Sequence, residues 1–128
     1  MKIDKRDQNV FVIFEVRLLP NKKDHYLELA EELKHLLNGA EGLVRTERFV
    51  SLKDEDKLLS LNVWKSEKDV DRWRNTIAHR ISQKEGRSEL FESYRITVAH
   101  TVREYGDKER EEAPEDSNKY FLEENDEG

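Results

Sequence analysis

Hydrophobic and polar positions along the chain repeat with a period of two residues in some stretches and three to four in others. A dense run of β-branched and aromatic residues from Val10 to Leu18 stops before Pro20 and predicts a strand. Both alternating faces of this strand begin apolar, so we expect it to be central and covered on both sides. Glu15 lies on one of these faces, where a carboxylate must be paired, hydrated or functional.

The next three stretches predict a helix and a hairpin. Asp24 to Asn38 repeats apolar side chains at helical spacing and stops before Gly39, where a left-handed residue favours a helix end. Gly42 to Ser51 and Leu58 to Trp64 both alternate, and a polar turn joins them. Together they predict an antiparallel hairpin.

The last predicted elements are a helical region and a strand. Ser66 is expected to cap the helix, with Asp69 in a capping-box-like position. A second helical portion, from about Ile77 to Phe91, contains Gly86, where we expect a bend or break. Residues 94–105 alternate once more and predict a fourth strand.

The order of these elements predicts the fold class. Strand, helix, strand, strand, helix, strand favours an α+β, ferredoxin-like βαββαβ fold, with a four-stranded antiparallel sheet and two helices on one face. The other face of the sheet would be bare, although the first strand is apolar there. Two copies packed sheet to sheet would cover it, which predicts a homodimeric α/β barrel.

Composition divides the chain into a body and a tail. Charged residues make up 41% of the chain and apolar residues 35%, which is little core material for a lone monomer. Residues 106–128 hold ten acidic and three basic side chains, a charge of −7, so the rest carries +1 of the total −6. We predict a flexible N-terminus at 1–8, a folded domain at 9–106 and a disordered acidic tail at 107–128.

The same composition narrows the classes of partner and location. A nearly neutral body lacks the basic footprint of a nucleic-acid-binding protein. Without cysteine there is no disulfide, thiolate nucleophile or cysteine metal site. The N-terminus is charged, and no apolar run approaches the roughly 20 residues that span a bilayer. We therefore expect a cytoplasmic protein without a nucleic-acid or membrane partner.

Large rings and polar groups are concentrated in the second half of the predicted domain. Trp64 and Trp73 are the two tryptophans of the chain, and each could be either a pocket wall or part of the core. Asn62 lies in mid-strand, where a buried amide must find hydrogen-bond partners. The other polar candidates are His79, Arg80, Gln83 and Arg87, and the next large rings are Phe91 and Tyr94. If the chain has a pocket, we expect it here.

Residues 9–106 resemble the antibiotic biosynthesis monooxygenase family of dimeric α/β barrels. The resemblance rests on Val10-Phe11-Val12-Ile13-Phe14-Glu15-Val16, Glu47-Arg48-Phe49, Leu59-Ser60-Leu61-Asn62-Val63-Trp64, Trp73-Arg74-Asn75, His79-Arg80, Gln83, Gly86-Arg87 and Val102-Arg103-Glu104-Tyr105-Gly106. It implies a cofactor-independent monooxygenase, in which a small, electron-rich, quinol-like aromatic substrate supplies the electrons to oxygen. Neither a metal nor another cofactor is expected for that reaction.

The implied reaction assigns roles to the candidate residues. The pocket must bind an aromatic ring, remove its hydroxyl proton and stabilise the anion that forms. His79 or Glu15 could take the proton, and Asn62 could donate to the oxygen. The substrate-binding residues would be Trp64, Trp73, Arg80, Gln83, Arg87 and Phe91.

Two alternatives to this function stay open, and so does the question of whether the chain is an enzyme. Heme-degrading members of the family combine an asparagine on the first strand with a tryptophan and a histidine on the second helix. Glu15, Trp73 and Gln83 stand at those positions here, and glutamine is a poor iron ligand. The first alternative is a heme-binding or heme-degrading monooxygenase, and the second is a non-enzymatic dimer that binds a small molecule.

Overall fold

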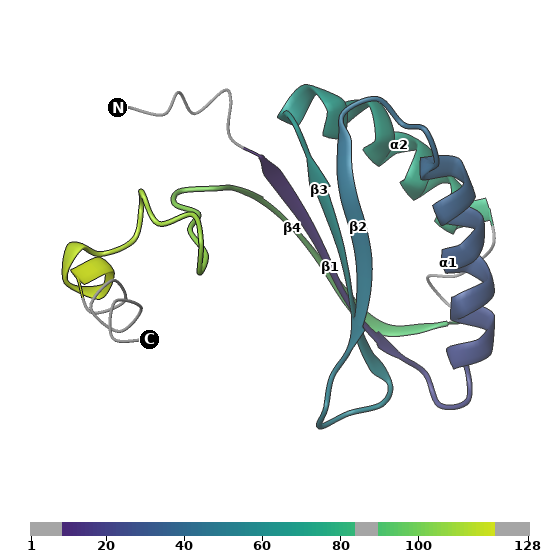
Figure 1. Cartoon of the computed structure of the whole chain (residues 1–128). Helices are drawn as coiled ribbons and strands as arrows, with labels where there is room; N and C mark the ends of the chain where they lie inside the picture. The colour runs from purple at the N-terminus through teal and green to yellow at the C-terminus, as the bar shows by residue number, and fades with distance from the viewer. Residues whose placement is uncertain (1–8, 84–89, 120–128) are drawn as a thin grey trace.

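The sheet and its two helices have the predicted order. The computed structural model describes residues 9–83 and 90–119, without the side chains of 77–83. The elements are β1 (Val10–Leu18), α1 (Lys23–Leu37), β2 (Leu43–Val50), β3 (Lys57–Trp64), α2 (Glu67–Gln83) and β4 (Phe91–His100). The antiparallel strands lie in the order β2-β3-β1-β4, and both helices cover one face (Figure 1). The predicted ferredoxin-like α+β fold is confirmed.

β1 is a central strand of the sheet, as its two apolar faces predict. It pairs with β3 on one side and with β4 on the other. Its helix-facing residues Val10, Val16 and Leu18 are each only 1% exposed. This burial makes β1 the support on which the helix layer packs.

The start of α2 is fixed by its cap and by a glycine. The Asp69 N–H donates to Ser66 Oγ (3.2 Å), which is the predicted cap. The Ser66 hydroxyl also donates to the Asp69 side chain at Oδ2 (2.9 Å), in place of the backbone bond that completes a capping box. Gly42 has a φ of 86°, and a Cβ built there would lie 2.2 Å from the Asp69 carboxyl group. Only glycine therefore lets the turn before β2 pack against this helix end.

The predicted ends of two elements are wrong. Phe91 is not the end of a helical portion; it opens β4, where its ring packs 5.9 Å from Phe14 and 6.0 Å from Tyr26 between centroids. Burial between the sheet and α1 places it in a strand, which helical spacing alone did not reveal. β4 also ends at His100 rather than at residue 105. The bend predicted at Gly86 lies outside the described residues.

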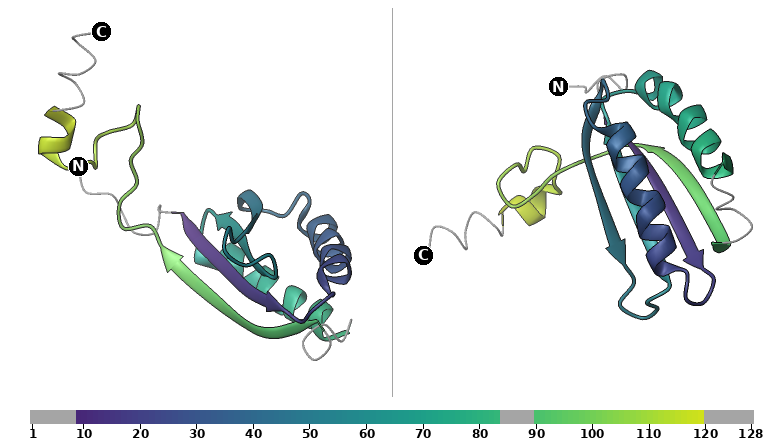
Figure 2. Two further views of the ribbon diagram at one scale, coloured as in Figure 1. Left: turned by 90° about the horizontal axis from the view of Figure 1, so that it is seen from below. Right: turned by 90° about the vertical axis from the view of Figure 1, so that its right-hand side faces the viewer.

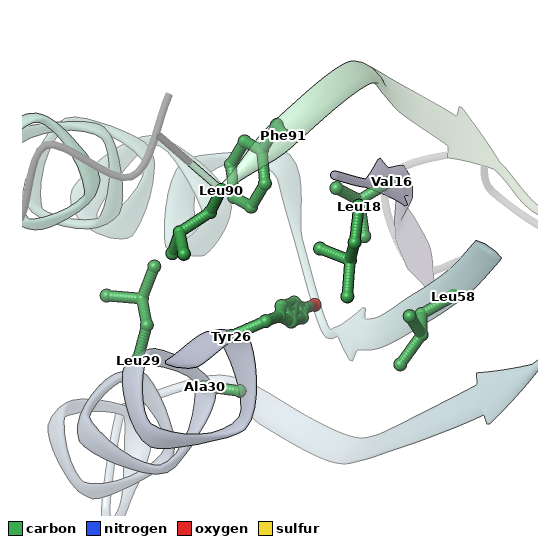
Figure 3. Packing of buried hydrophobic residues seen from close by; sticks show 8 residues of the cluster. All are labelled: Val16, Leu18, Tyr26, Leu29, Ala30, Leu58, Leu90 and Phe91. Carbon is green, nitrogen blue, oxygen red and sulfur yellow. The ribbon is translucent and has the colours of Figure 1, made fainter. Parts of the chain in front are cut away.

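The core between sheet and helices consists of two separate clusters. The first lies at the start of α1 and contains Val16, Leu18, Tyr26, Leu29, Ala30, Leu58, Leu90 and Phe91 (Figure 3). Figure 3 shows the Tyr26 ring reaching from α1 toward Leu18 and Leu58. The second cluster joins Val10, Leu37, Trp64 and Val70, with Trp73 packed against it. The two clusters hold the two ends of α1 on the sheet.

The other side of the sheet is uncovered by helices. Phe11 and Ile13 of β1 and Leu59 and Leu61 of β3 lie there and are half-buried. We call this the open face. Residues 101–119 lead away from both layers (Figures 1 and 2). In the described part of the chain, no helix combines the length and apolar character required to cross a membrane.

The apolar open face leads us to predict a homodimer. Packing two open faces together would remove half-exposed apolar side chains from water, which is the main source of association free energy. Light scattering at micromolar concentration should give twice the chain mass of 15.3 kDa. A mass equal to that of one chain would contradict the sheet-to-sheet dimer.

The tail should be dispensable for the fold. Arg110 donates to Gly106 O (3.2 Å), Ser117 Oγ (2.8 Å) and Asn118 Oδ1 (2.8 Å), and these contacts tie the segment to itself rather than to the sheet. Deleting 107–128 should therefore leave the melting temperature and the association state unchanged. An insoluble truncated chain, or a truncated monomer where the full chain is a dimer, would contradict this. The predicted disorder of the tail stays a prediction.

Candidate functional site

A cavity of about 400 Å³ lies between the sheet and α1, and we call it the sheet–helix cavity. This volume falls in the range of small-molecule pockets. Its apolar lining includes Val12, Phe14, Tyr26, Leu29, Phe91 and Ile96. Members of both core clusters border it, so the cavity is the space left between them.

Four polar residues interrupt this apolar wall, and strand register explains why they meet. Thr46 of β2 pairs with Asn62 of β3, and Arg48 pairs with Ser60. All four line the cavity, and we call them the polar patch. Because successive strand residues alternate faces, the pairs at 46–62 and 48–60 project to the same side of the sheet.

Asn62 is the most buried polar residue in the described part of the chain, with 9% of its surface exposed. The Thr46 hydroxyl donates to Asn62 Oδ1 at 2.6 Å. This bond uses the acceptor end of the amide and fixes its orientation. The Nδ2 end of Asn62 keeps its donors, in a residue that lines the cavity.

Tyr26 of α1 also lines this cavity. Burial raises the pKa of Tyr26, and the positive charge of Arg48 opposes part of that rise. The phenol is therefore neutral near pH 7 and can donate a hydrogen bond.

Of the residues assigned to substrate binding or catalysis, Asn62 and Phe91 line the cavity. Trp64 does not: it is 1% exposed and belongs to the second core cluster. Trp73 packs on Trp64 with ring centroids 6.3 Å apart and an interplanar angle of 35°. The structure thus brings the two tryptophans together as core, beside the cavity rather than around it.

Glu15 lies on the open face of the sheet. It pairs with Leu59 of β3 and with Arg95 of β4, whereas its neighbours Phe14 and Val16 face the helices. Opposite charges placed across neighbouring strands stabilise a sheet. Glu15 is therefore on the other side of the sheet from Asn62.

The remaining assigned residues come from α2 and the segment after it. His79, Arg80 and Gln83 belong to α2, but their side chains are outside the described residues. Arg87 lies wholly outside them. The roles of these four residues stay predictions.

Sequence reasoning did not assign several residues that line the cavity, namely Tyr26, Lys34, Thr46, Arg48, Ser60 and Arg74. Tyr26 was grouped with the apolar stripe of its helix, where the hydroxyl is easily overlooked. A signal for the polar patch was present, because Thr46 and Arg48 share one face of their strand. Register with the partner strand was also needed to connect them with Ser60 and Asn62.

A metal site is absent from the part of the chain that the structure describes, where no three histidine or carboxylate side chains gather to hold an ion. No histidine occurs among the described residues that line the cavity. The described site thus offers apolar walls, an oriented amide, hydroxyl groups and cationic side chains.

Comparison with known proteins places this chain in a family. Residues 9–85 match the sequence model of the antibiotic biosynthesis monooxygenase family. A relative from Pyricularia oryzae, named Jasmonate monooxygenase ABM, is 36% identical over 91 residues. The match covers 71% of this chain but only 42% of that relative.

Solved structures share the fold at low sequence identity. A protein of Nitrosomonas europaea superposes with a TM-score of 0.66 and 14% identity, covering 83% of this chain and 100% of that one. The cofactor-independent oxygenase SnoaB of Streptomyces nogalater gives a TM-score of 0.63 and 8% identity, with 76% and 96% covered. With the matching family model and the 36% identical relative, the chain belongs to the antibiotic biosynthesis monooxygenase family.

Proposed function

We propose that the protein is a cofactor-independent monooxygenase that binds a small, quinol-like aromatic molecule in the sheet–helix cavity. The observation that carries the proposal is the buried amide of Asn62, oriented by Thr46 in a cavity with an aromatic wall. Family membership and the monooxygenase name of the Pyricularia oryzae relative support the reaction class. SnoaB supports an oxygenase on this fold that works without a cofactor.

The proposed reaction balances without a further electron donor. A base removes the hydroxyl proton of the phenolic substrate, and the electron-rich anion reacts with oxygen at a ring carbon. One oxygen atom becomes a ring carbonyl. The hydrogen of that carbon and the hydroxyl proton leave with the other oxygen atom as water. The phenol becomes a quinone, and its four electrons reduce the oxygen molecule.

Asn62 is the proposed donor to the substrate oxyanion. Thr46 occupies Oδ1, so the Nδ2 donors are the part of the amide that can meet a ligand. A donor that is already oriented requires little reorganisation as charge develops. Tyr26, neutral because burial raises its pKa, is a second donor that lines the cavity.

His79 is the proposed base. An unperturbed imidazole titrates at a pKa of about 6.5, so it can accept a proton near neutral pH. Its place in α2, the helix that joins α1 in covering the sheet, supports this assignment (Figure 1). Glu15 was the other candidate, and its position on the open face weighs against it.

Heme dependence is the less favoured alternative for this cavity. Heme iron is usually held by histidine, cysteine, methionine or tyrosine. The described lining contains no histidine, and its Tyr26 phenol is neutral because burial raises its pKa. The proposed reaction therefore does not involve heme. The kinetic test below distinguishes it from the other alternative, a non-enzymatic protein that binds a small molecule.

Replacement of Asn62 should slow the reaction without unfolding the protein. The test is oxygen consumption with a panel of dihydroxy-aromatic quinols and with jasmonate, with no added metal or flavin. Asn62→Ala should cost about 10²–10³-fold in rate, the usual effect of losing one oxyanion donor. Thr46→Val, which frees Asn62 to rotate, should cost about 10-fold through a lost hydrogen bond.

Asn75→Ala is the matched control, because Asn75 is an exposed amide on α2 that does not line the cavity. Its rate should equal that of the unchanged protein, and the melting temperature should show that all variants fold. Activity that survives Asn62→Ala, His79→Ala and Glu15→Gln alike would place the chemistry elsewhere. No turnover with any compound would favour the non-enzymatic alternative.

Hemin should bind weakly and without a defined axial imidazole. Because glutamine replaces the histidine of heme-degrading relatives at Gln83, titration with hemin should give no sharp Soret shift. A clear shift that disappears in His79→Ala would show that His79 binds iron. The heme-dependent alternative would then replace the present proposal.

A further inference from the structure

The sheet–helix cavity has two chemically different ends. Phe14, Phe91 and Ile96 lie at the β1 and β4 end, where Phe14 pairs with Ile96 in the sheet and packs on Phe91. The polar patch lies at the β2 and β3 end. A ligand that matches both ends must itself have an apolar part and a polar part.

Arg48 brings a positive charge to the polar end. Its nearest described carboxylate is Glu31 of α1, with Nη2 and an oxygen 3.9 Å apart. This distance exceeds that of a hydrogen bond, so the guanidinium keeps its donors for another acceptor. The charge of Arg48 also opposes the rise in the pKa of buried Tyr26, and both residues line the cavity.

Lys34 adds a second positive charge at the same end. It lines the cavity from α1, one turn beyond Glu31, and residues three apart on a helix are neighbours. Because Glu31 approaches Arg48, the Lys34 and Arg48 side chains start from adjacent parts of the cavity wall. Lys34 forms no ion pair with a carboxylate among the described residues.

The cavity is therefore locally cationic in an acidic chain. Its described lining holds three cations, Lys34, Arg48 and Arg74, and one carboxylate, Glu47. Arg74 lies 3.7 Å from Asp71 and Arg48 lies 3.9 Å from Glu31, whereas Lys34 forms no ion pair with a carboxylate among the described residues. The chain outside residues 106–128 carries a net charge of only +1, so this excess is concentrated in the lining of the cavity.

We infer that the sheet–helix cavity selects ligands that carry an ionised carboxylate on an apolar body. Arg48 and Lys34 hold the carboxylate, and the apolar body lies against Phe14 and Phe91. A guanidinium matches the two oxygens of a carboxylate with parallel hydrogen bonds, and the ammonium of Lys34 adds a point charge. The inference shares one assumption with the proposed function, namely that the substrate binds in this cavity.

The experiment compares acids with their neutral methyl esters. Isothermal titration calorimetry of the full chain uses two matched pairs, jasmonate with methyl jasmonate and 1-naphthoate with methyl 1-naphthoate. Each acid should bind about 10-fold or more tightly than its ester, as expected for charged hydrogen bonds. Added salt should weaken the binding of the acids and leave that of the esters unchanged.

Substitutions test which residues cause the preference for acids over esters. Arg48→Gln should weaken acid binding about 10-fold with little effect on the esters, and Arg48→Lys should restore part of the loss. Lys34→Gln should have a smaller effect in the same direction. Arg45→Gln is the matched control, because Arg45 pairs with Val63 on the same strand pair and does not line the cavity. It should bind like the unchanged protein.

The outcomes separate this inference from the proposed function. Equal affinities for acid and ester, equal effects of Arg48→Gln and Arg45→Gln, or no binding of any probe would overturn the carboxylate preference. Quinol oxidation could continue in each of those cases. Conversely, a carboxylate preference that depends on Arg48, without oxygen consumption on any substrate, would support the inference and contradict the proposed oxygenase.

Discussion

The site depends on how α1 is held away from the sheet. At its start, Tyr26 packs on Phe91, with ring centroids 6.0 Å apart, and at its end Leu37 joins Trp64 and Val70. Each end of α1 is therefore packed against a large aromatic ring, namely Phe91 at its start and Trp64 at its end. The cavity of about 400 Å³ lies between these two contacts and is bordered by residues of both core clusters.

The cavity also explains how the polar patch can lie between the sheet and α1 without a large loss of stability. A buried amide without partners would cost about 1–3 kcal/mol, but Thr46 satisfies one end of Asn62. The cavity leaves room for water or a ligand at the other end. The buried apolar contacts are concentrated in the two core clusters, and the polar patch lies outside both of them.

Much of the fold was predictable from the sequence, but the set of residues that line the cavity was not. β1, the hairpin and the Ser66 cap follow from period, turn and spacing, which are local properties. Phe91 was placed in a helix because its burial comes from Phe14 and Tyr26, which are distant in sequence. Trp64 looked like a pocket wall because ring size is visible in a sequence, whereas contact with Leu37 and Val70 is not.

The fold and the polar end of the cavity depend on different residues in this chain. The residues that make the fold are buried and apolar, such as Val10, Val16 and Leu18 of β1. Shared architecture at 8% identity with SnoaB shows how far such positions can vary while the topology persists. Thr46 and Arg48 line the cavity from an edge strand, so they can change without disturbing either core cluster. Substrate choice within this architecture should therefore be decided on β2, and not by the tryptophans that first draw attention in the sequence.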